Sequence, residues 1–558
     1  MTFTNTKRAI IQDQLQKEHF DLFIIGGGIT GTGIALDAAA RGMKAGLVDM
    51  QDFSAGTSSR STKLVHGGLR YLKQFEIGMV AEVGKERTIV YENGPHVTTP
   101  EKMLLPIYKG GTFGRFTTSI GLRVYDFLAG VKKLERRTML TKGKVLKQEP
   151  LLNSEHLKGG GYYVEYRTDD SRLTIEVAKK AVEKGAVLLN YVKAIEFLYN
   201  EKGVVKGVVL EDQLTKKRYK VFARKIINAS GPWVDLIREK DHSKLGKTLQ
   251  LTKGVHLVFD QSRFPLKQAI YFDTPDKRMI FAIPRQGKTY VGTTDTFYED
   301  DPVSPEITEI DVRYLLQSIN GIFPSLNLSK GDIDSGWAGV RPLILEEGKG
   351  PSEISRKDEI WTSDSGLITI AGGKLTGYRK MAETVVDFVS ADLKAEEGLV
   401  FGGCQTRNLP ISGGDFGGSS KFKAFLDDQV IAGVKAGLMP EDARQIASVY
   451  GTNAAALFEI ISNRGHEDGK YQLPLNIYAQ LIYAVEKECI ANAVDFFLRR
   501  TGALLFNISL VKKWKGNVIR ALADIFHWSE KEKRLYTSQL DTEIAKTQIA
   551  LGFLSKQT

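Results

Sequence analysis

The clearest pattern of apolar and polar positions lies near the start of the chain. Residues 22–25 form a short apolar run that is typical of a buried parallel strand. A stretch with the character of a helix follows at 32–41, and Gly42 is placed to end it. A second apolar run at 45–48 predicts another strand, which finishes at Asp49. The order strand, helix, strand indicates a parallel α/β unit.

The turn between the first strand and the helix is rich in glycine. Residues 26–31 (GGGITG) fit the pattern GxGxxG. Gly26 permits a tight turn, Gly28 lets a pyrophosphate approach the backbone, and Gly31 lets the helix pack closely on the strand. Asp49, 18 residues beyond Gly31, is placed to accept hydrogen bonds from ribose hydroxyls, and its charge disfavours a 2′-phosphate. Because the helix N-terminus also offers N–H groups to phosphates, the unit predicts dinucleotide binding without separating FAD from NAD.

A second loop follows at once, at residues 57–71 (TSSRSTKLVHGGLRY). Small hydroxylated residues at this density favour loops and caps, and they can satisfy pyrophosphate oxygens. The glycine pair lets the backbone come close to a flat ring. An NAD dehydrogenase needs no second cofactor loop at this point, so the segment favours a flavin. From the residues alone, a solvated Ser/Thr loop remains the alternative.

Segment 57–71 resembles the flavin-contacting signature of FAD-dependent (aerobic-type) glycerol-3-phosphate dehydrogenases and their oxidase relatives. Further segments agree with that family in type and order. They are 228–233 (NASGPW), 253–256 (KGVH), 292–295 (GTTD), 339–342 (GVRP) and 372–379 (GGKLTGYR). The similarity spans about 20–400 and continues weakly through 449–453 and 498–501. One departure is Asp49, where relatives often carry Glu, so the side chain has a shorter reach to a ribose.

The resemblance implies an α/β fold in which an FAD-binding, Rossmann-like, doubly wound domain is interleaved with an antiparallel-sheet substrate domain. Within residues 1–400, we expect the FAD part over about 20–98, 168–240 and 336–396, and the substrate part over about 99–167 and 241–335. The FAD part should be a parallel sheet with helices on both faces. A glycine-rich stretch at 402–418 indicates a linker. We expect residues 401–558 to form a C-terminal helical domain with a scaffolding or assembly role.

The resemblance also implies an activity. It is the oxidation of sn-glycerol 3-phosphate to dihydroxyacetone phosphate by hydride transfer to FAD, with a quinone or similar compound as the electron acceptor. A glycerol-3-phosphate oxidase that uses O₂ is the alternative, although such oxidases carry an extra internal segment for which this chain shows no obvious room. An amine or amino-acid oxidase needs a carboxylate clamp, and a flavin-binding sensor leaves the arginines and the histidine of the site unexplained.

Five residues are candidates for the chemistry. Arg70 and Arg341 suit the substrate phosphate, because a guanidinium presents a planar fork and stays charged near neutral pH. His256 is the candidate base, since histidine titrates near working pH, and a role in orienting substrate is its alternative. Tyr71 is placed to bond the substrate or to position Arg70. Lys374, at a glycine turn that enters a helix, offers positive charge to the reduced flavin.

The cofactor contacts implied by the same motifs form a larger set, in which His66 is expected to support the flavin. They are Gly26, Gly28, Gly31, Asp49, Thr57, Ser58, Thr62, Lys63, His66, Gly67, Gly68, Leu69, Ala229, Gly231, Gly373, Lys374, Leu375 and Thr376. No metal site is predicted.

Composition changes this picture in few respects. The 558 residues exceed what one core usually accommodates. Two cysteines, Cys404 and Cys489, lie far apart without CxxC spacing, which argues against disulfides and zinc and fits a reducing cytoplasm. A net charge of +11 attracts phosphorylated substrates, nucleic acids or anionic lipids without choosing among them. No aromatic-interleaved basic tract supports nucleic acid as a partner. The oligomeric state is not predicted.

Contact with a membrane is open from the sequence. No signal peptide and no run of about 18 apolar residues is found. Apolar residues between 113 and 133 recur at spacings of three and four, on one face of an expected helix with basic residues beside it. Such a helix suits the headgroup region of a bilayer and a quinone pool, although packing against the substrate domain is the commoner role of such a face. The expected location is cytoplasmic, with peripheral contact to the inner face of the membrane as the alternative.

Overall fold

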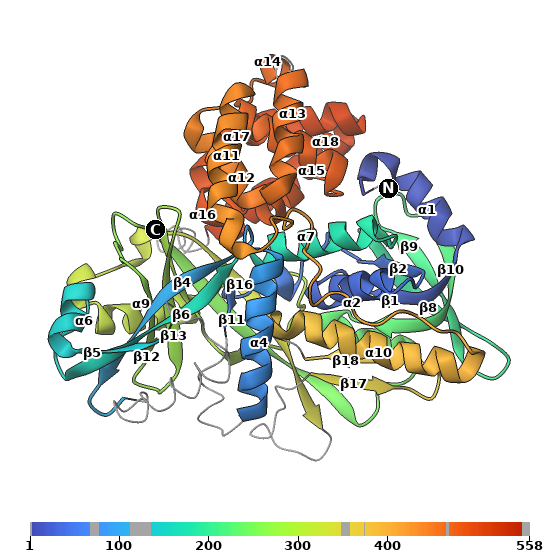
Figure 1. Cartoon of the computed structure of the whole chain (residues 1–558), viewed down its shortest axis with the longest axis horizontal. Coiled ribbons are helices and arrows are strands. Elements are labelled where there is room, and N and C mark those ends of the chain that lie inside the picture. The colour runs from blue at the N-terminus through green and yellow to red at the C-terminus, as the bar shows by residue number, and fades with distance from the viewer. Residues whose placement is uncertain are drawn as a thin grey trace.

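The structure is a computed structural model that describes residues 3–66, 77–111, 136–346, 358–372, 374–464 and 468–548. Two β-sheets lie side by side, and a group of C-terminal helices lies above their junction in the view of Figure 1. The helix expected over 113–133 falls outside the described residues.

The first sheet contains the predicted strand–helix–strand unit. Its main strand order is β17-β18-β10-β1-β2-β7, and the hairpin β8–β9 joins it through β10. The strands are β1 His19–Ile25, β2 Ala45–Val48, β7 Val187–Leu189, β8 Val192–Tyr199, β9 Val205–Asp212, β10 Arg218–Asn228, β17 Glu359–Thr362 and β18 Ile368–Ala371. The central strands β18, β10, β1, β2 and β7 are parallel, whereas β17 and the hairpin pair antiparallel. The apolar run of β1 is buried at the centre of this sheet.

Helices pack around this sheet. They are α1 Arg8–Lys17, α2 Ile29–Ala40, α4 Ile77–Asn93, α7 Asp170–Glu183, α8 Val234–Lys240 and α10 Tyr378–Glu397. Helix α2 lies between α7 and α10 and is buried over most of its length. Gly33 makes this arrangement possible, because a Cβ at that position would meet the ring of Tyr378 on α10 at 3.1 Å. The glycine turn at the start of α2 is therefore held in a rigid layer.

The second sheet is larger and mostly antiparallel. Its main order is β15-β11-β14-β13-β12-β4-β6-β3, with β16 paired to β11 and β5 to β6. The strands are β3 Leu64–Val65, β4 Thr98–Tyr108, β5 Thr138–Thr141, β6 Leu157–Thr168, β11 Lys247–Asp260, β12 Ala269–Asp273, β13 Met279–Arg285, β14 Lys288–Gly292, β15 Thr296–Phe297 and β16 Ile333–Glu346. Among the described strands of this second sheet, only the β12–β4 pairing is parallel. Helices α6 Lys142–Gln148 and α9 Glu309–Ile322 accompany it.

The expected α/β class with an antiparallel partner sheet is confirmed, and both sheets prove to be mixed. The chain passes between the two sheets several times, as interleaving requires. Residues 336–346, which we assigned to the FAD part, pair with β11 in the second sheet. Our division of the chain into domains remains a proposal.

The C-terminal region has a hydrophobic core of its own, which includes Leu457, Leu481 and Leu522. Its helices are α11 Phe422–Lys435, α12 Pro440–Tyr450, α13 Ala454–Arg464, α14 Asp468–Tyr471, α15 Leu475–Lys487, α16 Ala503–Phe506, α17 Ile508–Phe526 and α18 Glu530–Thr547, with a π-helical turn, η12, at Asp495–Arg500. This confirms the expected helical character. Within the described ranges, none of the helices combines the length and the apolar character needed to cross a bilayer.

Candidate active site

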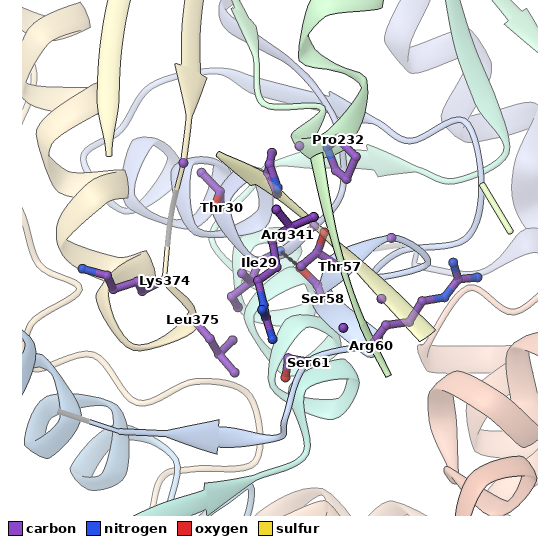
Figure 2. Close-up of a pocket in the computed structure, with 18 of the residues that line it drawn as sticks. Ile29, Thr30, Thr57, Ser58, Arg60, Ser61, Pro232, Arg341, Lys374 and Leu375 are labelled. Carbon is purple, nitrogen blue, oxygen red and sulfur yellow. Dashed lines mark hydrogen bonds between the residues drawn. The ribbon is translucent and has the colours of Figure 1, made fainter. Parts of the chain in front are cut away.

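A cavity of about 1230 Å³ lies where the two sheets meet. The first sheet contributes the glycine turn, the segment after β2, and the segments 192–194 and 229–240. The second sheet contributes side chains of β6, β12, β13 and β16. Figure 2 shows these side chains converging from several elements, with Lys374 and Leu375 on one side and Arg60 and Ser61 on the other. The cavity therefore joins the predicted cofactor motifs to the predicted substrate sheet.

The glycine turn has the shape that a dinucleotide requires. A Cβ on Gly26 would overlap the carbonyl oxygen of Ala229, and one on Gly31 would overlap the carbonyl oxygen of Gly26. Gly28 caps α2, and the N–H of Ile29 donates to Ser58 Oγ at 3.0 Å (Figure 2). The start of α2 thus faces the cavity with backbone N–H groups and a hydroxyl beside them, a set of donors that suits a pyrophosphate.

Asp49 lies at the cavity wall, at the end of β2. Its carboxylate accepts from the N–H of Gly27 at 2.6 Å and from the N–H of Gln51 at 2.8 Å. Burial raises the pKa of Asp49 to about 6, against the effect of these two bonds. The carboxylate is therefore fixed beside the glycine turn, where the hydroxyls of a ribose would complete its hydrogen bonding.

The hydroxyl-rich loop packs between β16 and α7. Thr57 Oγ donates to the carbonyl of Val340 at 2.6 Å, and a Cβ on Gly339 would overlap the backbone of Arg60. The ammonium of Lys63 is buried and donates to Asp170 at 2.6 Å. We predicted Lys63 as a cofactor contact, but the structure places its side chain in this ion pair and off the cavity wall.

Arg341 lies on the wall on the side of the second sheet. Its guanidinium is 3.5 Å from the carboxylate of Asp295 and 3.3 Å from the hydroxyl of Thr293. Gly254, on the neighbouring strand β11, makes room for it, since a Cβ there would lie 2.9 Å from the guanidinium. Arg341 therefore places a cation on the cavity wall, on the side of the second sheet.

His256 lies behind the wall rather than on it. The side chain is 1% exposed, and its ring stacks on Trp337 with 4.7 Å between the centroids. Its Nε2 is 3.0 Å from the hydroxyl of Thr62, which does line the cavity. Burial, followed by the charges of Arg341 and Lys63, lowers the pKa of His256 well below its usual value. In this position, His256 reaches the cavity through Thr62.

His66 is the histidine on the cavity wall. Its carbonyl accepts from the hydroxyl of Thr376 at 3.1 Å, which ties the second loop to the turn that carries Lys374. Burial lowers the pKa of His66, Glu165 opposes this shift, and the charge of Lys374 adds to it. A histidine with a lowered pKa is neutral at working pH and can accept a proton.

Several wall residues carried no signal in the sequence. Glu165 sits in β6, where an alternating pattern reads as a solvent-facing position, yet it is buried against Arg87 at 3.0 Å. Tyr271 and Phe281 stack at 4.1 Å and form an apolar surface beside His66. Both belong to ordinary apolar strands, so only the fold identifies them. This surface suits one face of a flat ring.

The remaining predicted contacts divide into two groups. Ala229, Gly231, Leu375 and Thr376 line the cavity, as does Lys374. Gly67, Gly68, Leu69, Arg70, Tyr71 and Gly373 fall outside the described residues.

The residues present fit FAD. The glycine turn and Ser58 provide donors for the pyrophosphate, Asp49 an acceptor for the ribose, and the aromatic surface a platform for the ring system. A family model described as FAD dependent oxidoreductase matches residues 21–379, which is more than half of the chain. The chain belongs to the FAD-dependent oxidoreductases. A second model, described as the C-terminal domain of alpha-glycerophosphate oxidase, matches residues 404–533 of this oxidoreductase.

Two relatives and one solved structure narrow the family. The aerobic glycerol-3-phosphate dehydrogenase of Bacillus subtilis (strain 168) is 62% identical over 97% of both chains, and that of Staphylococcus haemolyticus (strain JCSC1435) is 56% identical over 98% of both. The structure of the glycerol-3-phosphate dehydrogenase from Bacillus halodurans complexed with FAD covers 98% of both chains, with 49% identity and a TM-score of 0.86. These matches confirm the resemblance seen in the motifs.

A second solved structure, the L-alpha-glycerophosphate oxidase from Mycoplasma pneumoniae, shows the fold alone. It has 17% identity and a TM-score of 0.55, over 70% of this chain and 97% of that one.

The raised pKa of Asp49 predicts how FAD affinity changes with pH. Ribose hydroxyls that donate to the carboxylate favour its charged form, so FAD binding below pH 6 must release a proton. We expect FAD affinity to be constant above about pH 7 and to fall by up to about tenfold for each pH unit below 6. Fluorescence titration of the apoprotein measures this. Asp49→Asn should bind FAD more weakly at neutral pH and lose the pH dependence, and a wild type that binds equally well at about pH 5 and pH 7.5 would contradict the assignment.

Proposed function

We propose that this protein oxidises sn-glycerol 3-phosphate to dihydroxyacetone phosphate and passes the electrons through FAD to a quinone. One observation carries the proposal. The residues that suit FAD (the glycine turn, Ser58 and Asp49) and Arg341 of the opposite sheet line the same cavity. The names of the relatives and the FAD in the structure of one of them support the same reaction. Bound FAD supplies the acceptor of the hydride from C2 of the substrate.

We assign the binding of the substrate phosphate to Arg341, with Arg70 as its predicted partner. Asp295 and Thr293 hold the guanidinium from one side, which fixes a planar fork suited to phosphate oxygens. The charge of Arg341 also contributes to the lowered pKa of both His66 and His256, so the cation lies close to both histidines. Phosphate binding at Arg341 would hold a three-carbon substrate near these two rings.

We assign the removal of the hydroxyl proton to His66. Its place on the cavity wall and its neutral state support this role. His256, our candidate from the sequence, keeps a role as a positioning residue, since its Nε2 bonds to the wall residue Thr62. We assign Lys374 to the edge of the flavin, where an ammonium stabilises negative charge.

We also propose that the electron acceptor is a quinone and that the protein works at the membrane surface. A quinone pool requires the protein to reach the membrane, and the helix expected over 113–133 is our candidate for that contact. The alternative is transfer to O₂.

Removal of the Arg341 charge should weaken the capture of glycerol 3-phosphate. We expect Arg341→Met to lower kcat/KM by an amount worth about 2–5 kcal/mol, because the substrate phosphate would enter the cavity without its charged partner. The loss should fall mainly on KM. Neutral glycerol, which lacks the phosphate, should react equally slowly with both proteins. Arg263→Met removes an exposed arginine in the turn between β11 and β12 and serves as the control. Wild-type kinetics in Arg341→Met would exclude the phosphate assignment.

The two histidines can be separated by rapid kinetics. We expect His66→Asn to slow anaerobic reduction of the flavin by about 10²–10⁴-fold and to remove the acidic limb of its pH profile. His256→Asn should keep that limb, because the base would still be present. Stopped-flow measurements of flavin reduction across pH provide both readouts. The opposite outcome, in which only His256→Asn loses the limb, would return the role of base to His256.

The acceptor is tested by steady-state turnover of glycerol 3-phosphate. We expect a soluble quinone to support rapid turnover and air to produce little H₂O₂, because a dehydrogenase transfers electrons to the quinone faster than to O₂. H₂O₂ formed in an amount equal to the dihydroxyacetone phosphate would identify an oxidase. If the protein turned over an amino acid but not glycerol 3-phosphate, the proposed reaction itself would be excluded.

A further inference from the structure

The loop at residues 49–54, between β2 and the hydroxyl-rich loop, holds the glycine turn from both sides. The N–H of Gly27 donates to Asp49, and the carbonyl of Gly27 accepts from the N–H of Ser54 at 3.1 Å. The ring of Phe53 lies against Gly27, so that a Cβ there would meet it at 2.6 Å. The position of the 49–54 loop therefore sets the conformation of the turn that faces the pyrophosphate.

The middle of this loop is held by the C-terminal helical region. Asp52 is fully buried. Its carboxylate accepts hydrogen bonds from Arg500 Nη1 at 2.8 Å and from Arg500 Nη2 at 3.0 Å. Arg499 Nε donates to the same carboxylate at 2.7 Å, and Asn190 completes the set at 2.8 Å. The Arg500 guanidinium also donates to the carbonyl of Glu488 within its own region. A bidentate pair with further bonds on both partners fixes a single geometry.

A second link runs in parallel to the first. The N–H of Tyr191 donates to the carbonyl of Gln51 at 2.8 Å, and its hydroxyl donates to Asp495 at 2.6 Å. Asp495 also pairs with Arg499. Val192, the residue after Tyr191, lines the cavity, whereas neither Tyr191 nor the two arginines do. The segment 488–500 thus holds two cavity segments without touching the cavity.

We propose that segment 488–500 is a positioning element for FAD, in which Arg499 and Arg500 hold Asp52 and thereby keep the 49–54 loop in its cofactor-binding conformation. FAD binding and the docking of this segment on the first sheet are then coupled and strengthen each other. The role is distinct from scaffolding, because it predicts a change in cofactor affinity at a distance. The proposed role of segment 488–500 concerns FAD binding alone. Its test therefore does not depend on whether glycerol 3-phosphate is the substrate.

The test compares two isosteric changes of buried acids at the same interface. Asp52→Asn weakens the link to the 49–54 loop. Glu176→Gln is the control: Glu176 of α7 is also fully buried and accepts from Arg172 Nε at 2.9 Å, but it lies outside segment 488–500 and off the cavity wall. Both changes should lower the melting temperature of the apoprotein, since each breaks a buried ion pair.

Only Asp52→Asn should change the cofactor affinity. We expect its Kd for FAD, measured by flavin fluorescence on the apoprotein, to rise roughly tenfold to a hundredfold, as for residues that orient the ligands of a metal. Arg500→Lys, which keeps the charge but loses the bidentate geometry, should retain part of the affinity. Glu176→Gln should stay within about twofold of wild type. An unchanged Kd in Asp52→Asn, or an equal loss in Glu176→Gln, would overturn the proposal.

A measurement on the wild type covers the case in which the variants do not fold. Because coupling is reciprocal, FAD should slow amide hydrogen exchange in segment 488–500 roughly tenfold, although no residue of that segment lines the cavity. The amides of α13, in the same helical core, serve as the internal control and should not change. Equal exchange of segment 488–500 with and without FAD would show that the segment is not coupled to the cofactor.

Discussion

The site depends on the antiparallel pairing of β11 with β16 and on what the glycines of these strands allow. The register places Gly254 opposite Gly339, Thr252 opposite Arg341, and His256 opposite Trp337. Gly254 has no side chain, which leaves room for the guanidinium of Arg341. Gly339 has none either, which leaves room for the backbone of Arg60. The hydroxyl-rich loop of the cofactor side can therefore lie directly on the substrate sheet.

Burial and charge then set the protonation states. Burial and nearby cations lower the pKa of both histidines near Arg341, which favours the neutral form that can accept a proton from an alcohol. Asp49 has a raised pKa because few groups around it compensate for burial, and ribose hydroxyls would supply what is missing. By contrast, the ammonium of Lys63 is bonded to Asp170 and serves to hold the loop. Lys63 and Arg341 both lie in conspicuous sequence motifs, yet Lys63 holds a loop whereas Arg341 lines the cavity.

Local chemistry made part of this arrangement predictable. The glycine turn, the strands beside it and Asp49 follow from spacing along one short stretch, and the structure brings them together as expected. Contacts between distant residues were not visible in the same way. The partner of Lys63 is Asp170, and the partner of Asp52 is Arg500, at sequence separations of 107 and 448 residues. The helical region, for which the composition indicated only a scaffold, therefore also contacts the 49–54 loop through Arg499 and Arg500.

The side of a strand was also hidden from the sequence. His256 lies in a strand whose neighbouring positions are buried on both faces, so the usual alternation does not tell which side chains reach the cavity. Only the structure shows that the ring of His256 stacks on Trp337 behind the wall and reaches the cavity through Thr62. His66, in contrast, comes after a two-residue strand, where side-chain direction follows from the turn rather than from periodicity.

The proposed function requires that one cavity holds FAD beside a site for a phosphorylated alcohol. Anaerobic titration of the FAD-loaded protein with glycerol 3-phosphate tests it most directly. We expect the visible absorbance of the flavin to bleach completely with near-equimolar glycerol 3-phosphate, and neutral glycerol at the same concentration to leave the spectrum unchanged. A flavin that stays oxidised in excess glycerol 3-phosphate, or that is reduced equally well by glycerol, would contradict it.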